Sequence, residues 1–522
     1  MSEDRAKKLV KDTLEASFSE EQFKNLMIEL LKDDFDLSKT FSCQGNYIPA
    51  NFKEYIISYK HLGQFKTDKK EIIDVLVVKL KSETTLERSR STQRNFIRWY
   101  LNDKPGDAAL VAFIAPDSDN WRFSFVKMQY RFDKNGKIKD DTTPAKRYSF
   151  LVGKNESSHT AQSRFLPLIS LDKKPTLDDL EQAFNAERVT DEFFEQYKEL
   201  FIKTVDEIEK SIENNKILKN EFTNKNISIV DFAKKLLGQI VFLYFLQKKG
   251  WLGVPKNKNW GEGDKNFLRS LFERSIEEKK NFFNDYLEYL FYDALNNERS
   301  SQADPSWHEY LSCRIPFLNG CLFEPFGDYD WKNIDLLIPN DLFSNNAKDG
   351  ILDIFDLFNF TVKEDEPLEK EVAVDPELLG KIYEKLNAIR EDNFEEYKKA
   401  LKSKGSENKF NKEYGVYYTP REIVHFMAQS ALVEYLFENL KGKSQNLESL
   451  KEDLKAFIFY SEKFIENDKT AIEKEEKIKK GEQKSTKYTS ILTFIKENAK
   501  TIDKLLEDVR ILDPAVGSGA FP

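Results

Sequence analysis

Cysteine and histidine are scarce in this 522-residue chain, and their scarcity excludes two classes of protein. The three cysteines, Cys43, Cys313 and Cys321, are too few for a disulfide scaffold, and none has the C-x-x-C spacing of a zinc ligand pair. The four histidines are scattered, without an H-E-x-x-H or H-x-H pair. The sequence therefore indicates neither a disulfide-stabilised fold nor a motif-bound zinc centre.

Long apolar runs and an excess of basic charge are also missing. No stretch approaches the roughly 18 apolar residues of a membrane span, and the charged N-terminus lacks the apolar core of a signal peptide. We therefore expect no membrane partner and a cytoplasmic location. The 81 Lys and Arg against 90 Asp and Glu give a net charge of −9, which excludes a small, wholly basic nucleic-acid module. A basic groove on an acidic protein remains compatible with this balance.

Aromatic residues, at 13%, are frequent enough for buried cores, and the length predicts about three or four domains. Residues 1–175 have the pattern of a mixed α/β domain, because short β-branched and aromatic runs alternate with turn signals. The predicted strands are 54–65, 71–81, 108–116 and 121–132, and the predicted helices are 17–33 and 86–102. This order indicates one sheet with helices packed on it.

Residues 176–400 have a mainly helical pattern. Apolar residues recur every three or four positions over 190–212, with Thr190 as the predicted N-cap. A more apolar helix is predicted over 228–250, where Gly250 ends it. From residue 401 the pattern is again helical, apart from a Lys- and Glu-rich interval that is either a solvated insertion or a DNA-facing surface.

Two strings in the last part of the chain carry the strongest functional signal. Residues 509–512 have the composition of a short buried parallel strand, and the string DPAVGSGAFP follows at 513–522. Glycines in such a turn let the backbone come close to a ligand, because they lack the Cβ atoms that would block the approach. The backbone amides of the turn can then bind a carboxylate or another polar group of the ligand. The second string, GVYYTP at 415–420, opens a predicted helix, where a Thr-Pro turn offers a hydroxyl and free amides.

Together the two strings resemble the cofactor loop, and the element preceding it, of amino-methyltransferases that use S-adenosylmethionine on DNA adenine. The resemblance implies that these residues bind the cofactor: Tyr417, Tyr418, Thr419, Pro420, Asp513, Pro514, Ala515, Gly517, Ser518 and Gly519. Further segments around 87–101, 243–255, 315–325 and 353–386 resemble large single-chain type IIG restriction–modification enzymes and their phage-defence relatives.

This resemblance implies an α/β fold in three parts. It implies a nuclease-like mixed-sheet domain over 1–175, a mainly α-helical connector over 176–400, and the start of a class I, Rossmann-like methyltransferase domain over 401–522. The chain covers about the first half of the family plan, without the Asn-Pro-Pro-Tyr-type motif that grips the flipped adenine. We therefore expect this chain alone not to methylate DNA, and to bind S-adenosylmethionine weakly or not at all. Its expected partners are double-stranded DNA and the missing C-terminal half.

Residues 66–79 are the candidate site of a PD-(D/E)xK-type nuclease, in which two carboxylates hold Mg²⁺ and a Lys helps to activate water. Asp68 and Asp74 are the candidate Mg²⁺ ligands and, with Lys79, the candidate catalytic residues. Val77 stands where the motif has its second acid. The alternative is a nuclease-like domain without its metal ligands, with Asp74 at a strand edge and Lys79 on the surface.

Arg90, Arg94 and Arg98 share one face of a predicted helix, next to several aromatic residues. This face is a candidate contact for DNA phosphates. The alternative is that these arginines pair with nearby Asp and Glu residues.

The sequence as a whole indicates that this chain is part of a restriction–modification or phage-defence protein. We expect that protein to methylate adenine in DNA with S-adenosylmethionine. If its nuclease is active, we expect the N-terminal domain to cleave DNA in a Mg²⁺-dependent reaction. Two alternatives stay open: a nuclease with a vestigial methyltransferase half, and a non-catalytic, truncated remnant that binds DNA or a protein partner.

Overall fold

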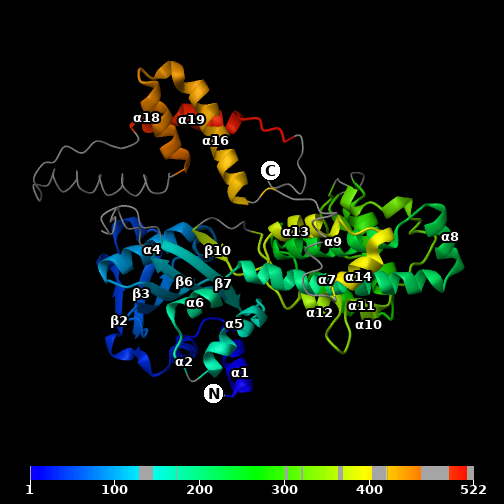
Figure 1. Cartoon of the computed structure of the whole chain (residues 1–522), viewed down its shortest axis with the longest axis horizontal. Coiled ribbons are helices and arrows are strands. Elements are labelled where there is room, and N and C mark those ends of the chain that lie inside the picture. The colour runs from blue at the N-terminus through cyan, green and yellow to red at the C-terminus, as the bar shows by residue number, and fades with distance from the viewer. Residues whose placement is uncertain are drawn as a thin grey trace, which may run out of the picture. The chain divides into compact units, whose positions relative to one another are not determined.

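The computed structural model has the mixed α/β class that the sequence predicts. It describes residues 2–128, 145–171, 173–299, 304–318, 321–362, 368–401, 419, 421–459 and 493–513. The chain divides into two compact units, Met1–Gly415 and Val416–Pro522 (Figure 1).

Within the described residues, eight strands of the first unit form one mixed sheet in the order β1-β3-β4-β5-β6-β7-β10, with β2 pairing on β3. The strands are β1 (Phe35–Asp36), β2 (Phe41–Gln44), β3 (Ile56–Lys66), β4 (Ile72–Leu80), β5 (Ala108–Ile114), β6 (Asn120–Met128), β7 (Ala145–Gly153) and β10 (Glu369–Glu371). Strands β4 and β5 are parallel, as are β7 and β10, whereas the other pairs are antiparallel. The four predicted strands correspond to β3, β4, β5 and β6, whereas β1, β2, β7 and β10 of this sheet were not predicted.

Apolar side chains cover both faces of the sheet, so that β4 is buried on each side. Ile73, Val75 and Val77 join one core, whereas Leu76 and Val78 join the other. The first core includes α1 (Glu3–Leu14), α2 (Glu20–Leu31), α5 (His159–Ser170) and α6 (Leu177–Ala183), and the second includes α3 (Glu83–Arg88) and α4 (Arg90–Asp103). Because strand side chains alternate, Asp74 lies on the face that α4 covers.

The helical part of the first unit is built on two long helices that pack together, α7 (Glu187–Glu213) and α9 (Ile229–Lys248). The other helices around them are α8 (Lys216–Asn224), α10 (Phe267–Glu277), α11 (Asn340–Phe343), α12 (Ile351–Phe355), α13 (Glu377–Leu386) and α14 (Phe394–Leu401). A small hairpin joins β8 (Trp307–His308) to β9 (Cys313–Arg314). The helices predicted over 190–212 and 228–250 are confirmed. The N-cap predicted at Thr190 is wrong, because α7 begins one turn earlier and buries Val189 and Thr190.

The second unit is helical in its described residues. It contains α16 (Arg421–Leu440), a helix over 447–459, α18 (Thr493–Glu497) and α19 (Ala499–Asp508), around a small core that includes Leu436, Leu454 and Ile502. The buried strand predicted over 509–512 is wrong, since Ile511 and Leu512 are 80% and 87% exposed. A parallel strand needs a neighbouring strand to pair with, and the described residues of this unit provide none.

A carboxyl group is buried between two π-helical segments, Phe283–Leu287 and Tyr289–Leu295. Glu288 lies between them and is 1% exposed. Burial raises the pKa of Glu288 to about 9, and the nearby carboxylates of Asp335 and Asp285 act in the same direction. The folded protein therefore holds a proton at neutral pH that the unfolded chain releases.

We expect Glu288→Gln to stabilise the protein at pH 8 and to reduce the pH dependence of its stability. The pKa of Glu288 is raised from 4.5 to about 9, so the wild type loses free energy of unfolding as the pH rises through that window. The loss amounts to about 1.4 kcal/mol per pH unit at most. Urea denaturation of both proteins at pH 5.5 and pH 8 measures it, and equal pH dependence in the two would contradict the assignment.

Candidate functional site

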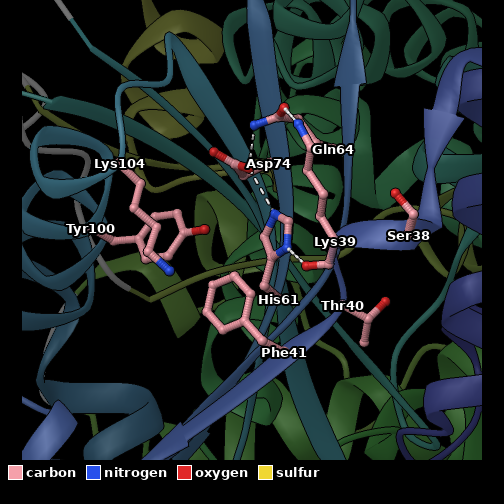
Figure 2. A pocket seen from close by; sticks show the side chains of 9 residues that line it. All are labelled: Ser38, Lys39, Thr40, Phe41, His61, Gln64, Asp74, Tyr100 and Lys104. Atoms are coloured by element: carbon pink, nitrogen blue, oxygen red, sulfur yellow. Dashed lines mark hydrogen bonds and ion pairs between the residues drawn. The ribbon is translucent and has the colours of Figure 1, made fainter.

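A pocket of about 380 Å³ opens beside Asp74 on the face of the sheet that α4 covers (Figure 2). It is lined by Ser38, Lys39, Thr40, Phe41, His61, Gln64, Asp74, Tyr100 and Lys104. These residues come from the segment before β2, from strands β2, β3 and β4, and from the end of α4. A pocket of this size is in the range that takes a small ligand or part of a larger one.

A β-bulge in β3 puts two polar side chains on the same side of Asp74. His61 and Gln64 are three residues apart, so strict alternation would place them on opposite faces. The register against β4 shifts between His61 and Gly63, which brings both onto the pocket face. A Cβ atom on Gly63 would lie 2.7 Å from the carbonyl oxygen of Asp36, which is too close. Strand β1 can therefore pack this closely only against a glycine.

Asp74 is held by these two side chains and is only 2% exposed. Its Oδ1 lies 2.7 Å from His61 Nε2 and accepts a hydrogen bond from Gln64 Nε2 at 3.2 Å. His61 Nδ1 lies 2.8 Å from the Lys39 carbonyl oxygen, which can only accept. Both ring nitrogens are thus engaged, so His61 positions Asp74 and has no nitrogen left to act as a base in the pocket.

Two lysines give the pocket a cationic lining. Lys39 Nζ donates to Gln64 Oε1 at 2.8 Å, and Lys104 Nζ lies 3.5 Å from the centre of the Phe41 ring. Within the part of the chain that the structure describes, neither ammonium group forms an ion pair with a carboxylate. Burial and the charge of Asp74 raise the pKa of Tyr100 well above its usual range, so its phenol stays neutral. The two ammonium groups outnumber the one acidic side chain of the lining, Asp74, so the pocket favours an anionic group.

The structure does not bring Asp68, Asp74 and Lys79 together. Asp68 forms an exposed ion pair with Lys174 at 2.7 Å. Lys79 lies five residues after Asp74 on β4, which puts the two side chains on opposite faces, and Lys79 is exposed. Among the described residues, no group of three or more His, Cys, Asp or Glu side chains could hold a metal ion. These residues do not fit the predicted Mg²⁺ centre, and the nuclease roles assigned to them stay predictions.

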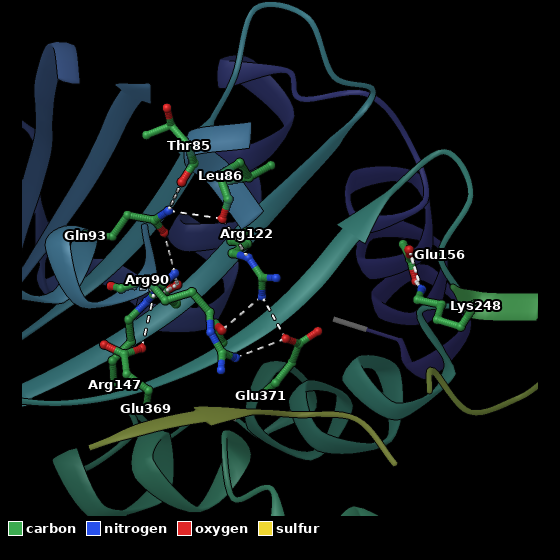
Figure 3. A network of polar contacts seen from close by, with 12 residues as sticks. Thr85, Leu86, Arg90, Gln93, Arg122, Arg147, Glu156, Lys248, Glu369 and Glu371 are labelled. Carbon is green, nitrogen blue, oxygen red and sulfur yellow. Dashed lines mark hydrogen bonds and ion pairs between the residues drawn. The ribbon is translucent and has the colours of Figure 1, made fainter. Parts of the chain in front are cut away.

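Two of the three arginines expected to contact DNA, Arg90 and Arg94, belong to a buried ionic network, part of which is drawn in Figure 3. Arg90 pairs with Glu371 at 3.3 Å and Arg94 with Glu369 at 3.4 Å, while Arg98 is half-buried. Both glutamates lie on β10, more than 270 residues further along the chain. The sequence left open whether these arginines contact phosphates or pair with Asp and Glu residues, and the structure shows Arg90 and Arg94 paired with glutamates. The phosphate contact of Arg90, Arg94 and Arg98 stays a prediction.

Two further arginines complete this network. Arg122 pairs with Glu371 at 3.2 Å, and the fully buried Arg147 pairs with Glu369 at 3.4 Å. Arg147 Nη2 also donates to Gln93 Oε1 at 2.8 Å. The side-chain amide of Gln93 in turn donates to the carbonyl oxygens of Thr85 and Leu86. The network therefore ties α3, α4, β6, β7 and β10 together.

Of the predicted cofactor residues, the structure describes Thr419, which is exposed, and Asp513, which is half-buried. Tyr417, Tyr418, Pro420, Pro514, Ala515, Gly517, Ser518 and Gly519 lie outside the described residues. The cofactor role of all ten stays a prediction. Sequence reasoning missed His61, Lys39 and Lys104. For His61 the available signal was a polar residue inside the strand pattern of β3, whereas Lys39 and Lys104 lie outside that strand.

The chain is similar to a protein whose name describes a restriction enzyme and methyltransferase. A protein of Methanocaldococcus jannaschii, "Putative type II restriction enzyme and methyltransferase RM.MjaORFECS2P", is 28% identical in an alignment 360 residues long, which covers 64% of this chain. The chain spans about a quarter of that relative's length, 25%. No protein-family model and no solved structure matches the chain. Among the described residues, no helix has both the length and the apolar character needed to cross a membrane.

We expect Glu369→Gln to destabilise the protein by about 3 kcal/mol, because it leaves Arg94 and Arg147 buried without their carboxylate. Chemical denaturation measures the loss. Arg88→Gln, on the exposed surface of α3, is the control and should change the stability by less than about 0.5 kcal/mol. Equal stabilities of the two variants would show that the network carries little of the fold's stability.

Proposed function

We propose that this chain is part of a DNA restriction–modification or phage-defence protein that transfers a methyl group from S-adenosylmethionine to the exocyclic amine of adenine. The observation that carries the proposal is the similarity to the M. jannaschii protein over 64% of the chain. The strings at 415–420 and 513–522 support it, because they resemble the cofactor-binding elements of such methyltransferases.

In the proposed reaction the second unit contributes the cofactor-binding residues. Residues 417–420 would line the methionine end of the cofactor, and the backbone amides of the glycine-rich string would bind polar atoms of the cofactor. S-adenosylmethionine supplies the methyl group when bound. The residues that grip the flipped adenine would come from the rest of the protein.

For the sheet of the first unit, the geometry favours DNA binding over cleavage. Lys39 and Lys104 line one pocket and form no ion pair with a carboxylate among the described residues, so their charges are available to a phosphate. Asp74 is instead held by His61 and Gln64, and its candidate partners Asp68 and Lys79 lie elsewhere. We therefore propose that this pocket holds a phosphate of the DNA backbone.

The methyl-transfer proposal is tested in the complete protein that carries this chain. We expect Tyr418→Ala and Gly517→Val each to reduce transfer of labelled methyl groups from S-adenosylmethionine to adenine in DNA by on the order of 100-fold, because they misplace the cofactor. Gln445→Ala, which changes an exposed residue of the same unit, should leave the rate unchanged. Wild-type rates in both variants, or methylation of cytosine, would refute the proposal.

The phosphate pocket is tested by duplex DNA binding at several salt concentrations. We expect Lys39→Gln and Lys104→Gln to weaken binding and to reduce the dependence of log K on log salt by about 0.9 for each phosphate that is no longer neutralised. Lys81→Gln, an exposed change at the end of β4, should leave both quantities unaltered. Fluorescence anisotropy with a labelled duplex measures them, and an unchanged salt dependence in the double variant would exclude the phosphate site.

A further inference from the structure

Three tryptophans beyond the end of α9 each lie against a cationic side chain. Lys249 Nζ is 3.9 Å from the centre of the Trp251 ring, and Lys256 Nζ is 5.4 Å from that of Trp307. The guanidinium carbon of Arg314 is 4.7 Å from the centre of the Trp260 ring. This repeated pairing of indole and cation lies outside both the Asp74 pocket and the residues with predicted roles.

Backbone hydrogen bonds hold the loop that carries Trp251 and Trp260 in one conformation. The amides of Gly261 and Gly263 both donate to the Gly250 carbonyl oxygen at 3.0 Å. Gly250 has φ +71°, and a Cβ atom there would lie 2.2 Å from the carbonyl oxygen of Gly261, so only glycine fits. Val254 and Arg314 exchange backbone hydrogen bonds at 3.3 and 2.9 Å, which joins the loop to β9. The surface is therefore organised before any ligand binds.

Arg314 is fixed beneath Trp260 by several contacts. It donates to the Lys258 carbonyl oxygen and to the Ser306 hydroxyl, each at 2.8 Å, and it pairs with Asp304 at 3.5 Å. With the guanidinium in place, Trp260 as a whole residue is still 40% exposed. A large aromatic side chain is thus presented to solvent from a rigid support.

The charge around this indole is positive, whereas the chain as a whole is acidic. Between Lys248 and Lys265 there are five lysines against one Glu and one Asp, in a chain of net charge −9. Lys256 and Lys258 are both exposed. Lys258 lies 3.3 Å from Glu262, but an ion pair between two exposed side chains is weak and leaves the lysine available to another anion.

We propose that Trp260, with Lys256, Lys258 and Arg314 around it, binds an unpaired stretch of DNA. An unpaired base offers a ring face on which the exposed indole can stack, while the lysines contact the adjacent phosphates. A duplex offers no such base face, and an acidic protein segment would satisfy the lysines but leave the indole uncovered. The choice of DNA as the partner rests on the proposed function; the site itself is distinct from the Asp74 pocket and from the cofactor strings.

The test uses the full chain and a fluorescein-labelled 20-nucleotide oligo(dT), with a duplex of the same length as the second arm. We expect Trp260→Ala to weaken binding of the single strand about tenfold and to change duplex binding little, because only the unpaired base stacks on the ring. Trp260→Phe should retain most of the affinity. Lys256→Gln combined with Lys258→Gln should reduce the salt dependence of single-strand binding.

Tyr47→Ala is the matched control, since Tyr47 is a 74%-exposed aromatic residue in the sheet part of the same unit. Unchanged thermal denaturation of the Trp260 variants shows that the fold is intact. The proposal is overturned if the chain does not bind the single strand, if Trp260→Ala binds it as Tyr47→Ala does, or if the loss is equal on the duplex. Methyl transfer by the complete protein is a separate measurement, so retained transfer without single-strand binding would overturn this site alone.

Discussion

The ion pairs between β10 and the arginines of the sheet are the interaction on which the rest of the first unit depends. A buried guanidinium group is tolerated only where carboxylates and other acceptors surround it, and Glu369 and Glu371 provide those carboxylates. Burial lowers the pKa of Arg147 to about 10, and the charge of Glu369 opposes that shift. Since β10 follows α7 to α12 in the chain, its pairing with β7 joins the chain beyond these helices back to the sheet. Lys248, at the end of α9, adds a second link through the buried Glu156 at 2.5 Å.

The same network also positions the pocket. Helix α4 contributes Arg90, Gln93 and Arg94 to the ionic contacts, and its last turns contribute Tyr100 to the pocket, with Lys104 directly after the helix. A helix fixed by buried charges at its start therefore holds a phenol and an ammonium group in place at its end. On the opposite wall, the bulge in β3 aims His61 and Gln64 at Asp74. The pocket thus depends on the sheet register and on α4 together.

A role in restriction–modification would give the separate features of this chain a common partner, DNA. The Asp74 pocket has a cationic lining that suits a phosphate, and the Trp260 surface joins an exposed ring to a positive local charge. The two surfaces differ in chemistry, since one is concave with a buried carboxylate and the other presents an aromatic face. The strings that resemble a methyltransferase belong to the second compact unit, so DNA contact and methyl transfer would be divided between the units.

The sequence by itself determined the mixed α/β class, the strands β3 to β6 and the long helices α7 and α9. Their apolar residues recur with the period of a strand or a helix, and that signal lies within each segment. It could not determine β10, which is only three residues long and charged at every position, because its pairing with β7 and its ion pairs join residues more than 200 positions apart. For the same reason, only the tertiary structure decided which residues share a site. The face on which a strand residue lies depends on the register and on bulges. Asp74 therefore contacts His61 and Gln64, whereas Lys79 lies on the opposite face of the sheet. Arg94 pairs with a carboxylate on a strand that is distant in the sequence.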